Sequence, residues 1–248
     1  MNVLPDVFIL LTATIDPGNT PFVARQDPRV RENDYLWALK GWLSLKERQR
    51  LIFCENSGAS LKQVEQCVNA WNVQKHQVTL IATDLNSESA LRGKGFGEME
   101  ILSEVLTRHS LIGDNDLVIK VTGRHRSRNK DKFLRLLLTR SPSVDLSCNL
   151  SKNLTVGDSR MFVIKKSCAV RHLLPRQNLV DDRKGIFFEH VLAQAVHSTL
   201  LDGGTWSPLV CDPSLYGYSG TSGAKFGVNI IGRLTRSLKQ ILIQKCYQ

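Results

Sequence analysis

Continuous apolar runs alternate with amphipathic stretches along the first half of the chain. Residues 7–13 (VFILLTA) form an unbroken apolar run, which is typical of a strand buried on both faces of a parallel sheet. Further strands are predicted at residues 51–54, 77–82 and 117–121, and helices at residues 35–46, at 61–71 and around Met99, Leu102, Val105 and Leu106. This alternation predicts an α/β fold with a doubly wound, mostly parallel central sheet.

The alternation weakens after about residue 140. Strands are predicted at residues 144–148 and 160–165, a helix at 186–200 and a loop rich in Gly, Ser and Tyr at 215–223. No Asp or Glu occurs from Pro213 onward, and Ile230, Leu234, Leu238, Ile241 and Leu242 share one face of a basic terminal helix. Such a helix can lie on an anionic membrane surface or pack on the domain.

Composition adds one unusual property, which is a net charge of +10 over 248 residues. It points to anionic partners, namely phosphates, nucleic acid or a negatively charged membrane surface. The six cysteines are scattered without metal-binding spacing, which favours reduced, buried thiols in a cytoplasmic protein. No basic residue precedes the first apolar run, so we interpret it as a strand and not as a signal peptide, and no stretch approaches the ~20 apolar residues that span a bilayer.

Polar side chains follow each of the four predicted parallel strands. Ligands of such sheets gather outside the carboxyl ends of the strands. The residues expected there are Thr12, Thr14 and Asp16 after the first strand, Glu55 and Asn56 after the second, Thr83 and Asp84 after the third, and Lys120, Thr122 and Arg124 on the fourth. Each of them alone fits a solvated loop, but their agreement across four strands makes a binding site an equal alternative.

A glycine-rich turn, Gly93-Lys94-Gly95-Phe96-Gly97, opens the helix before the fourth strand. It matches neither a P-loop nor a dinucleotide fingerprint, because its spacing is different. At a helix start, however, it offers exposed backbone N–H groups to an anion. Glu98 lies in the first turn, where it either interacts with the helix dipole or holds a ribose or sugar hydroxyl.

Asp114-Asn115-Asp116 has the form of paired aspartates that hold a metal, but it precedes the fourth strand. We therefore interpret it as a turn at the opposite edge of the sheet. Lys120 and Arg124 stand at the carboxyl end instead, where two cations either neutralise phosphate charge or form a salt-bridged surface pair.

Two later clusters offer acid/base chemistry. Asp158 precedes a predicted strand, and Glu189 and His190 enter a predicted helix. Either helix residue could deprotonate an acceptor hydroxyl, and the structural alternative is a helix with one polar face. The histidines have no metal-binding spacing.

Six segments together resemble a known family: LLTATIDPG, RxDPRVRENDY (25–35), IFCENSG (52–58), RGKGFGEMEI (92–101), VIKVTGR (118–124) and FFEHVLA (187–193). The chain resembles small bacterial GT-A-like glycosyltransferases that assemble surface polysaccharide, such as capsule, O-antigen or lipopolysaccharide. The resemblance spans most of the chain. It implies a nucleotide-sugar donor, a glycan or lipid-linked acceptor, and work at the inner face of the cytoplasmic membrane.

The resemblance implies one domain over residues 1–248, with a nucleotide-sugar-binding half at 1–140 and an acceptor-side half at 141–248. The donor-binding residues would be Thr12, Thr14, Asp16, Asn56, Lys94, Gly95, Glu98, Lys120, Thr122, Gly123 and Arg124. Asp158, Glu189 and His190 would be the catalytic residues. The family's divalent metal, Mn²⁺ or Mg²⁺, is in doubt because no Asp-x-Asp follows a strand, which leaves room for a nucleoside-monophosphate donor.

Two other functions compete with sugar transfer. A nucleic-acid-binding protein would use the net charge and the basic run at residues 124–130, but that run has no interleaved aromatic residues to stack on bases. A sugar nucleotidyltransferase would need a glycine-rich triphosphate loop after the first strand, and Asp16-Pro17-Gly18-Asn19 matches it poorly. We expect no nucleic-acid partner.

Overall fold

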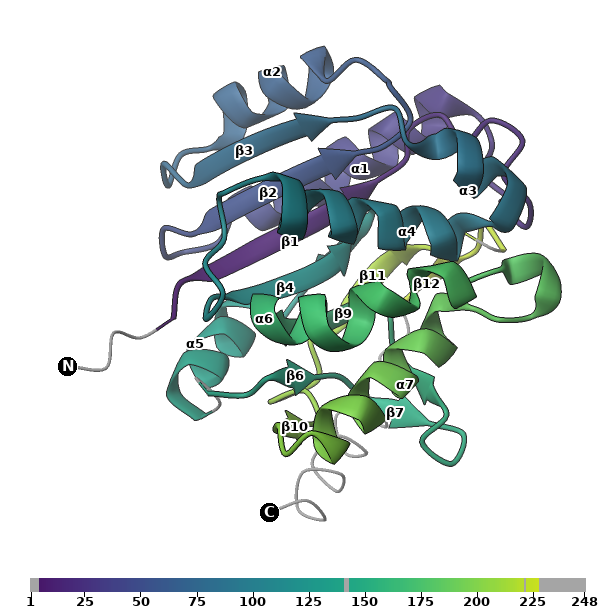
Figure 1. Ribbon diagram of the computed structural model, residues 1–248. Helices are drawn as coiled ribbons and strands as arrows, with labels where there is room; N and C mark the ends of the chain where they lie inside the picture. The colour runs from purple at the N-terminus through teal and green to yellow at the C-terminus, as the bar shows by residue number, and fades with distance from the viewer. Residues whose placement is uncertain (1–4, 141–142, 221, 228–248) are drawn as a thin grey trace.

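A seven-stranded sheet runs through the computed structural model, which describes residues 5–140, 143–220 and 222–227 (Figure 1). The strand order is β10-β6-β9-β4-β1-β2-β3. The strands are β1 (Val7–Ala13), β2 (Arg50–Glu55), β3 (Gln77–Ala82), β4 (Leu117–Thr122), β6 (Leu146–Ser147), β9 (Met161–Lys165) and β10 (Trp206–Ser207). β1 to β4 are mutually parallel and β9 is antiparallel to β4 and β6, so the sheet is mostly parallel, as predicted.

The register brings the carboxyl ends of the parallel strands to one edge. Ala13 of β1 is level with Glu55 of β2, which is level with Ala82 of β3, and Thr12 is level with Thr122 of β4. All seven residues of β1 are buried, because β1 has a strand on each side and helices on both faces. The unbroken apolar run that predicted this strand reflects that position.

Alternate residues of β1 enter two separate cores. Phe8 and Leu10 pack with α4 (Lys94–Ser103), η1 (Glu104–Arg108), η2 (Ala169–Leu173) and α7 (Phe188–Leu201). Ile9 and Leu11 pack on the other face with α1 (Pro28–Leu43), α2 (Lys62–Trp71) and α5 (Lys130–Arg140). The sheet is therefore the middle of three layers, with α4 in front of it and α1 behind it in Figure 1.

Two boundaries differ from the sequence expectation. The first helix begins at Pro28 and not at residue 35, since Asp27 accepts the N–H groups of Arg29 and Val30 and Pro28 fits the first helical turn. The segment expected to be a loop at 215–223 contains β11 (Leu215–Tyr218), which pairs with β5 (His125–Ser127) and β12 (Lys225–Phe226). Its partners are distant in sequence, so local composition did not predict the pairing.

The remaining elements are short, namely α3 (Asn86–Arg92), α6 (Lys166–Cys168), η3 (Leu174–Leu179), η4 (Asp182–Lys184), β7 (Leu150–Ser151) and β8 (Val156–Gly157). The predicted basic helix after residue 228 lies outside the described residues. Within the described part of the chain, the helices are too short or too polar to cross a membrane. The described cysteines are free thiols, and burial raises the pKa of Cys54 and of Cys148 to about 12.

Candidate active site

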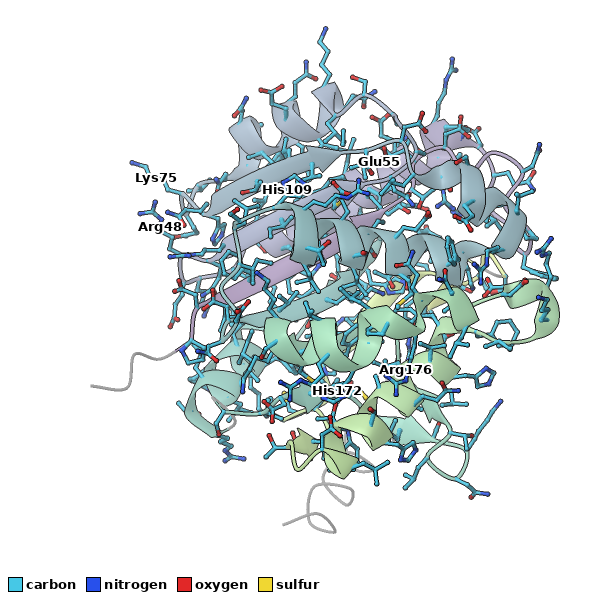
Figure 2. The ribbon with its side chains drawn as sticks, viewed as in Figure 1. Arg48, Glu55, Lys75, His109, His172 and Arg176 are labelled. Atoms are coloured by element: carbon cyan, nitrogen blue, oxygen red, sulfur yellow. The ribbon has the colours of Figure 1, made fainter. Side chains whose placement is uncertain are left out.

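Glu55 holds together the loops that follow β1 and β2. Its side chain is fully buried at the carboxyl edge of the sheet, whereas Arg48 and Lys75 lie at the opposite edge (Figure 2). Oε1 accepts the backbone N–H of Ile15 at 2.8 Å, and Oε2 accepts that of Ala59 at 3.1 Å. Ser57 donates to the same carboxylate through its backbone and its hydroxyl. A buried carboxylate requires such donors, and here they fix both loops.

Thr12, Thr14 and Asn56, three of the residues predicted to bind the donor, form hydrogen bonds inside the protein that stabilise this edge of the sheet. Thr14 donates through Oγ1 to Oδ1 of Asn56 at 2.6 Å, and Nδ2 of Asn56 donates to the Gly97 carbonyl at 3.4 Å, which connects the loop after β1 to α4. Thr12 is also buried, and its Oγ1 donates to the Val121 carbonyl. Asp16 is exposed beyond them, and its Oδ1 accepts the N–H of Gly18.

Arg31 gives the loop after β1 its shape, a role that the sequence analysis did not assign. Its buried guanidinium donates from Nε to the Thr14 carbonyl at 2.8 Å and from one terminal nitrogen to the Tyr35 hydroxyl at 3.1 Å. Arg25 pairs with Asp34 nearby, with 2.7 Å between Nε and Oδ2, and lies over the ring of Tyr218. The frequent Arg and Asp residues at positions 25–35 are the sequence feature that indicates this network.

A cavity of about 420 Å³ opens beside the carboxyl end of β4, and we call it the donor cavity. It lies between β4, the start of α4, the start of α7 and the β11–β12 hairpin. Six residues predicted from the sequence line it, namely Lys94, Gly95, Glu98, Thr122, Arg124 and Glu189. The structure thus brings together candidates that are 95 positions apart in the chain (94 and 189).

Lys120 does not face this cavity. It is fully buried, and its Nζ donates to Glu98 Oε2 at 2.7 Å, to the Ser159 carbonyl at 2.7 Å and to Thr122 Oγ1 at 3.2 Å. Its three N–H groups are therefore used within the protein. In this structure Lys120 is the buried partner of Glu98, rather than an exposed cation for phosphate.

Glu98 connects α4 to β4 through that pair. Its second oxygen accepts the hydroxyl of Thr122 at 3.2 Å, and its side chain is 22% exposed to the donor cavity. Burial alone would raise the pKa of Glu98. The ion pair with Lys120, together with Arg124 and Lys94, outweighs burial, and the pKa is lowered from its ordinary value. Glu98 therefore stays ionised.

The start of α4 already has an anion beside it, which is the carboxylate of Asp182. Oδ2 of Asp182 accepts the N–H of Gly95 at 3.3 Å. A Cβ atom on Gly93, whose φ is +114°, would lie 2.4 Å from that oxygen, so the glycine permits the close approach. Burial raises the pKa of Asp182. The glycine turn was expected to present this helix start to a ligand, and the structure gives that place to a side chain from η4.

Gly123 and Arg124 directly follow β4, and Arg124 lines the donor cavity. Gly123 donates to the Thr12 carbonyl at 2.9 Å, and a Cβ atom there would lie 2.5 Å from that oxygen. Arg124 is half-buried, lines the donor cavity and donates from Nε to the Tyr218 carbonyl at 3.1 Å. The arginine thus joins the end of β4 to β11.

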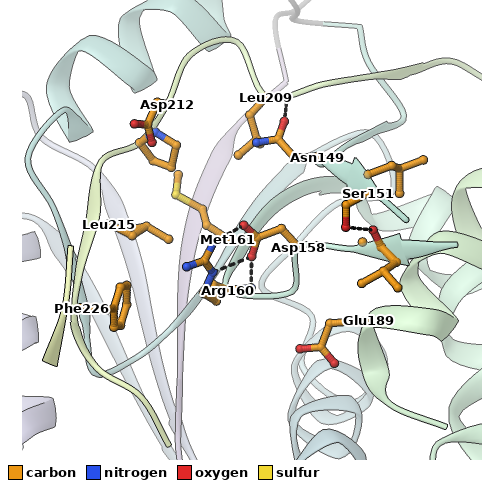
Figure 3. A pocket seen from close by; sticks show the side chains of 14 residues that line it. Asn149, Ser151, Asp158, Arg160, Met161, Glu189, Leu209, Asp212, Leu215 and Phe226 are labelled. Carbon is orange, nitrogen blue, oxygen red and sulfur yellow. Dashed lines mark hydrogen bonds and ion pairs between the residues drawn. The ribbon is translucent and has the colours of Figure 1, made fainter. Parts of the chain in front are cut away.

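A second cavity of about 430 Å³ adjoins the first, and we call it the outer cavity (Figure 3). The two cavities share Arg160, Glu189 and Phe226. Asp158 lines the outer cavity and holds Arg160 through two contacts, at 2.8 Å to Nε and 2.6 Å to a terminal nitrogen. Oε1 of Glu189 accepts the hydroxyl of Ser159 at 2.7 Å. Glu189 is therefore fixed at the boundary between the cavities.

His190 is placed differently from its neighbour Glu189. Its Nδ1 accepts the backbone N–H of Phe187 at 3.1 Å, which caps the start of α7. The residue is not part of the lining of either cavity. Successive helical residues point about 100° apart, so only one of the pair can face the cavities.

The carboxylates of the site do not form a metal centre. Asp114 and Asp116 lie in the turn before β4, where Asp116 accepts the N–H groups of Gly113 and Asp6, which confirms the sequence interpretation. Of the carboxylates that line the donor cavity, Glu98 is paired with Lys120 and Asp182 faces the start of α4. Within the described ranges, no cluster of three His, Cys, Asp or Glu residues could hold a metal ion. These residues do not fit a divalent cation.

No protein-family model matches the chain, and neither does any curated protein. Solved structures do. The galactosyltransferase LgtC in complex with donor and acceptor sugar analogues aligns at a TM-score of 0.52 and 14% identity, over 81% of this chain and 73% of that one. The glycosyltransferase GlyE of Streptococcus pneumoniae TIGR4 aligns at 0.50 and 11% identity, over 83% of this chain and 45% of that one.

The fold is GT-A-like. The chain spans less than half the length of GlyE. At such low sequence identity the similarity concerns the fold alone, and the fold is the one that the family resemblance implied. A GT-A-like fold agrees with the site's position, since the donor cavity opens at the carboxyl end of a parallel strand.

Proposed function

We propose that this protein is a glycosyltransferase, which moves a sugar from a nucleotide-activated donor to a glycan or lipid-linked acceptor. The observation that carries the proposal is the pair of adjoining cavities that share Glu189 at the carboxyl edge of the sheet. A group transfer between two substrates needs two sites that meet at the reacting atoms, with an acid/base residue at the boundary.

The donor would occupy the donor cavity, which both halves of the chain line, and the neighbouring loop after β1. Arg124 and Lys94 line this cavity and would offset the charge of the donor's phosphate, whereas Arg160 is already paired with Asp158. The loop after β1 would hold the nucleoside near Asp16, above the scaffold of Thr12, Thr14 and Asn56. Lys120 and Glu98 would act indirectly, by fixing Thr122 and the start of α4.

The acceptor would occupy the outer cavity, formed by residues after position 141. Its lining combines apolar side chains, such as Leu209 and Leu215, with the polar groups of Asn149 and Asp158, a mixture that suits the two kinds of surface on a sugar ring. In the reaction, the acceptor oxygen bonds to the anomeric carbon while the donor's phosphate oxygen leaves with the electron pair. Glu189 takes the proton of the attacking hydroxyl.

The biological setting belongs to the same proposal. The resemblance to enzymes of surface-polysaccharide assembly supports a role in bacterial capsule, O-antigen or lipopolysaccharide synthesis. An acceptor on a lipid carrier would place the enzyme at the inner face of the cytoplasmic membrane. The net charge of +10 favours contact with such an anionic surface.

The test is nucleotide release from a panel of UDP-, GDP- and CMP-sugars, measured with and without added glycan acceptors. We expect one donor to be turned over, and Arg124→Ala to raise its KM. Arg171→Ala is the matched control, since Arg171 is exposed on η2 and lines neither cavity. Absence of turnover and binding with every donor would refute the proposal. Pyrophosphate release from a nucleoside triphosphate and a sugar phosphate would instead favour the nucleotidyltransferase.

A further inference from the structure

The three-stranded sheet β12-β11-β5 has one face toward the donor cavity and one turned away from it. His125 of β5 and Phe226 of β12 line the cavity, and their rings meet edge-to-face with centroids 4.9 Å apart. Arg126 is paired with Tyr216 in the register of β5 and β11. Successive side chains of a strand point to opposite faces, so Arg126 and Tyr216 lie on the outward face.

Cations and aromatic rings alternate across this outward face and onto α1. The guanidinium of Arg126 lies over the ring of Trp37 at 4.0 Å, and that of Arg128 lies over the ring of Tyr216 at 4.1 Å. The rings of Trp37 and Tyr216 meet edge-to-face at 5.4 Å. Lys40 follows Trp37 by one helical turn and shares its side of α1. We call these five residues the cationic strip.

The cations of the strip are held in place without a carboxylate partner. Nε of Arg126 donates to the Trp37 carbonyl at 2.6 Å, and Arg128 donates to the Gly227 carbonyl at 2.7 Å. Among the described residues, no Asp or Glu forms an ion pair with Arg126, Arg128 or Lys40. The strip therefore presents fixed positive charge without a countercharge, which favours an anionic partner.

Two exposed apolar side chains adjoin the strip. Trp71, at the end of α2, is 52% exposed, and Nζ of Lys40 lies 4.0 Å from the centroid of its ring. Val73 follows two positions later and is 79% exposed. Basic side chains beside Trp, Tyr and exposed apolar groups are typical of a surface in contact with lipid headgroups, where the rings lie at headgroup level and the cations bind phosphate.

We propose that the cationic strip, together with Trp71 and Val73, docks on the surface of an anionic bilayer. This contact belongs to the proposed function, on which it rests for the lipid-linked acceptor, and it assigns the membrane to one face of the protein. The donor cavity then lies on the other side of the small sheet from the lipid, with its lining free to bind the donor.

The chemistry of the strip distinguishes a bilayer from other partners. Bases of nucleic acid stack on open ring faces, whereas the arginines of the strip already cover faces of its rings. A second copy of the chain would bring like charges together. The segment after residue 227 contains no Asp or Glu, so its side chains supply no countercharge either. A bilayer surface accommodates both the cations and the exposed apolar groups.

The experiment is sedimentation of the full chain with vesicles of phosphatidylcholine, or of phosphatidylcholine and phosphatidylglycerol in equal parts. We expect binding to the anionic vesicles only. Arg126→Gln/Arg128→Gln should weaken this binding about 10- to 30-fold, because two cations near the lipid phosphates are lost. Trp71→Ser/Val73→Ser, at exposed positions that do not affect folding, should weaken it about three- to tenfold through the loss of apolar contact.

The matched control is Arg108→Gln/Arg171→Gln. It removes the same charge from η1 and η2, where both arginines are exposed on the opposite side of the large sheet. Its vesicle binding should stay within about twofold of the wild type, since a surface charge far from the bilayer is screened. A loss equal to that of the strip variant would show that binding follows net charge, and the assignment to the strip would be wrong.

The remaining outcomes separate the docking face from sugar transfer and from nucleic acid. Arg126 and Arg128 line neither cavity, so nucleotide release with a soluble acceptor should be unchanged in Arg126→Gln/Arg128→Gln. Turnover without any vesicle binding would overturn the docking face and leave sugar transfer standing. Strip-dependent vesicle binding without turnover would do the reverse. Strip-dependent binding of oligo(dT) but not of vesicles would overturn the membrane in favour of nucleic acid.

Discussion

The pair of Lys120 and Glu98 is the clearest structural interaction at the scale of single residues. Removal of the lysine would leave Glu98 without its charge partner in a largely buried position. We expect Lys120→Met to reduce the free energy of unfolding by about 3–5 kcal/mol, measured by urea denaturation at neutral pH. Lys132→Met, at an exposed lysine of α5, should change it by less than about 0.5 kcal/mol.

The same pair predicts a pH dependence. The pKa of Glu98 is lowered in the folded protein, so the unfolded chain binds more protons in acid. The pair therefore contributes stability above the unfolded pKa of about 4.5, and this contribution is lost as pH falls through the folded value. Denaturation curves from neutral pH to about pH 3 should show a smaller loss in Lys120→Met/Glu98→Gln than in the wild type. Equal losses would contradict this prediction.

Glu189 carries the most specific catalytic prediction. We expect Glu189→Gln to lower kcat by about 10²–10⁴-fold with little change in donor affinity, because Gln keeps the contact with Ser159 but cannot take a proton. His190→Gln is the matched control, since His190 caps α7 and lines neither cavity. Equal loss of turnover in both variants would indicate a structural effect on α7 instead.

The sequence could predict which residues meet at this site better than it could predict what each of them does. Strand polarity placed Thr122 and Arg124 at this edge, and the glycine turn at a helix start added Glu98. The full burial of Lys120 depends on Ser159, which is 39 positions away, and so it required the tertiary structure.

At the scale of elements, the contact between Asp182 and the start of α4 joins two distant helical segments. A side chain at Gly93 would strain the backbone at its φ of +114° and collide with the carboxylate. We expect Gly93→Ala to reduce the free energy of unfolding by about 1–3 kcal/mol or more. Part of this loss should be recovered in Gly93→Ala/Asp182→Gly, where the Cβ atom and the carboxylate that collide with the added methyl group are both removed. Gly185→Ala is informative beside it, since that glycine shares a positive φ but has open space around it.

Element prediction succeeded where local pattern and tertiary position agree. β1, β2 and β4 are almost entirely buried, so their apolar runs mark them directly, whereas β3 is a partly exposed edge strand. The start of α1 was placed too late, because Asp27 and Pro28 lie in a polar segment whose capping chemistry outweighs its lack of apolar periodicity. β11 was missed since its residues resemble a loop, and only pairing with β5 and β12 makes them a strand.

At the scale of the whole molecule, the charges around the donor cavity predict whether a phosphorylated donor would need a divalent cation in order to bind. Lys94, Arg124 and Arg160 line the cavity, and its carboxylates already have partners within the protein. A divalent cation needs several oxygen ligands directed at one point, which this set does not supply among the described residues.

We therefore expect donor affinity to be independent of divalent metal. Calorimetric titration of the best sugar nucleotide should give the same Kd in EDTA as in Mn²⁺ or Mg²⁺. The Kd should rise with salt concentration, because exposed charges are screened, and Arg124→Ala should weaken that dependence. Melting of the ligand-free protein in EDTA controls for effects on the fold. Affinity that is lost in EDTA and restored by Mn²⁺ would contradict the prediction and would require Glu98, Asp182 or Glu189 to leave its internal partner when the donor binds.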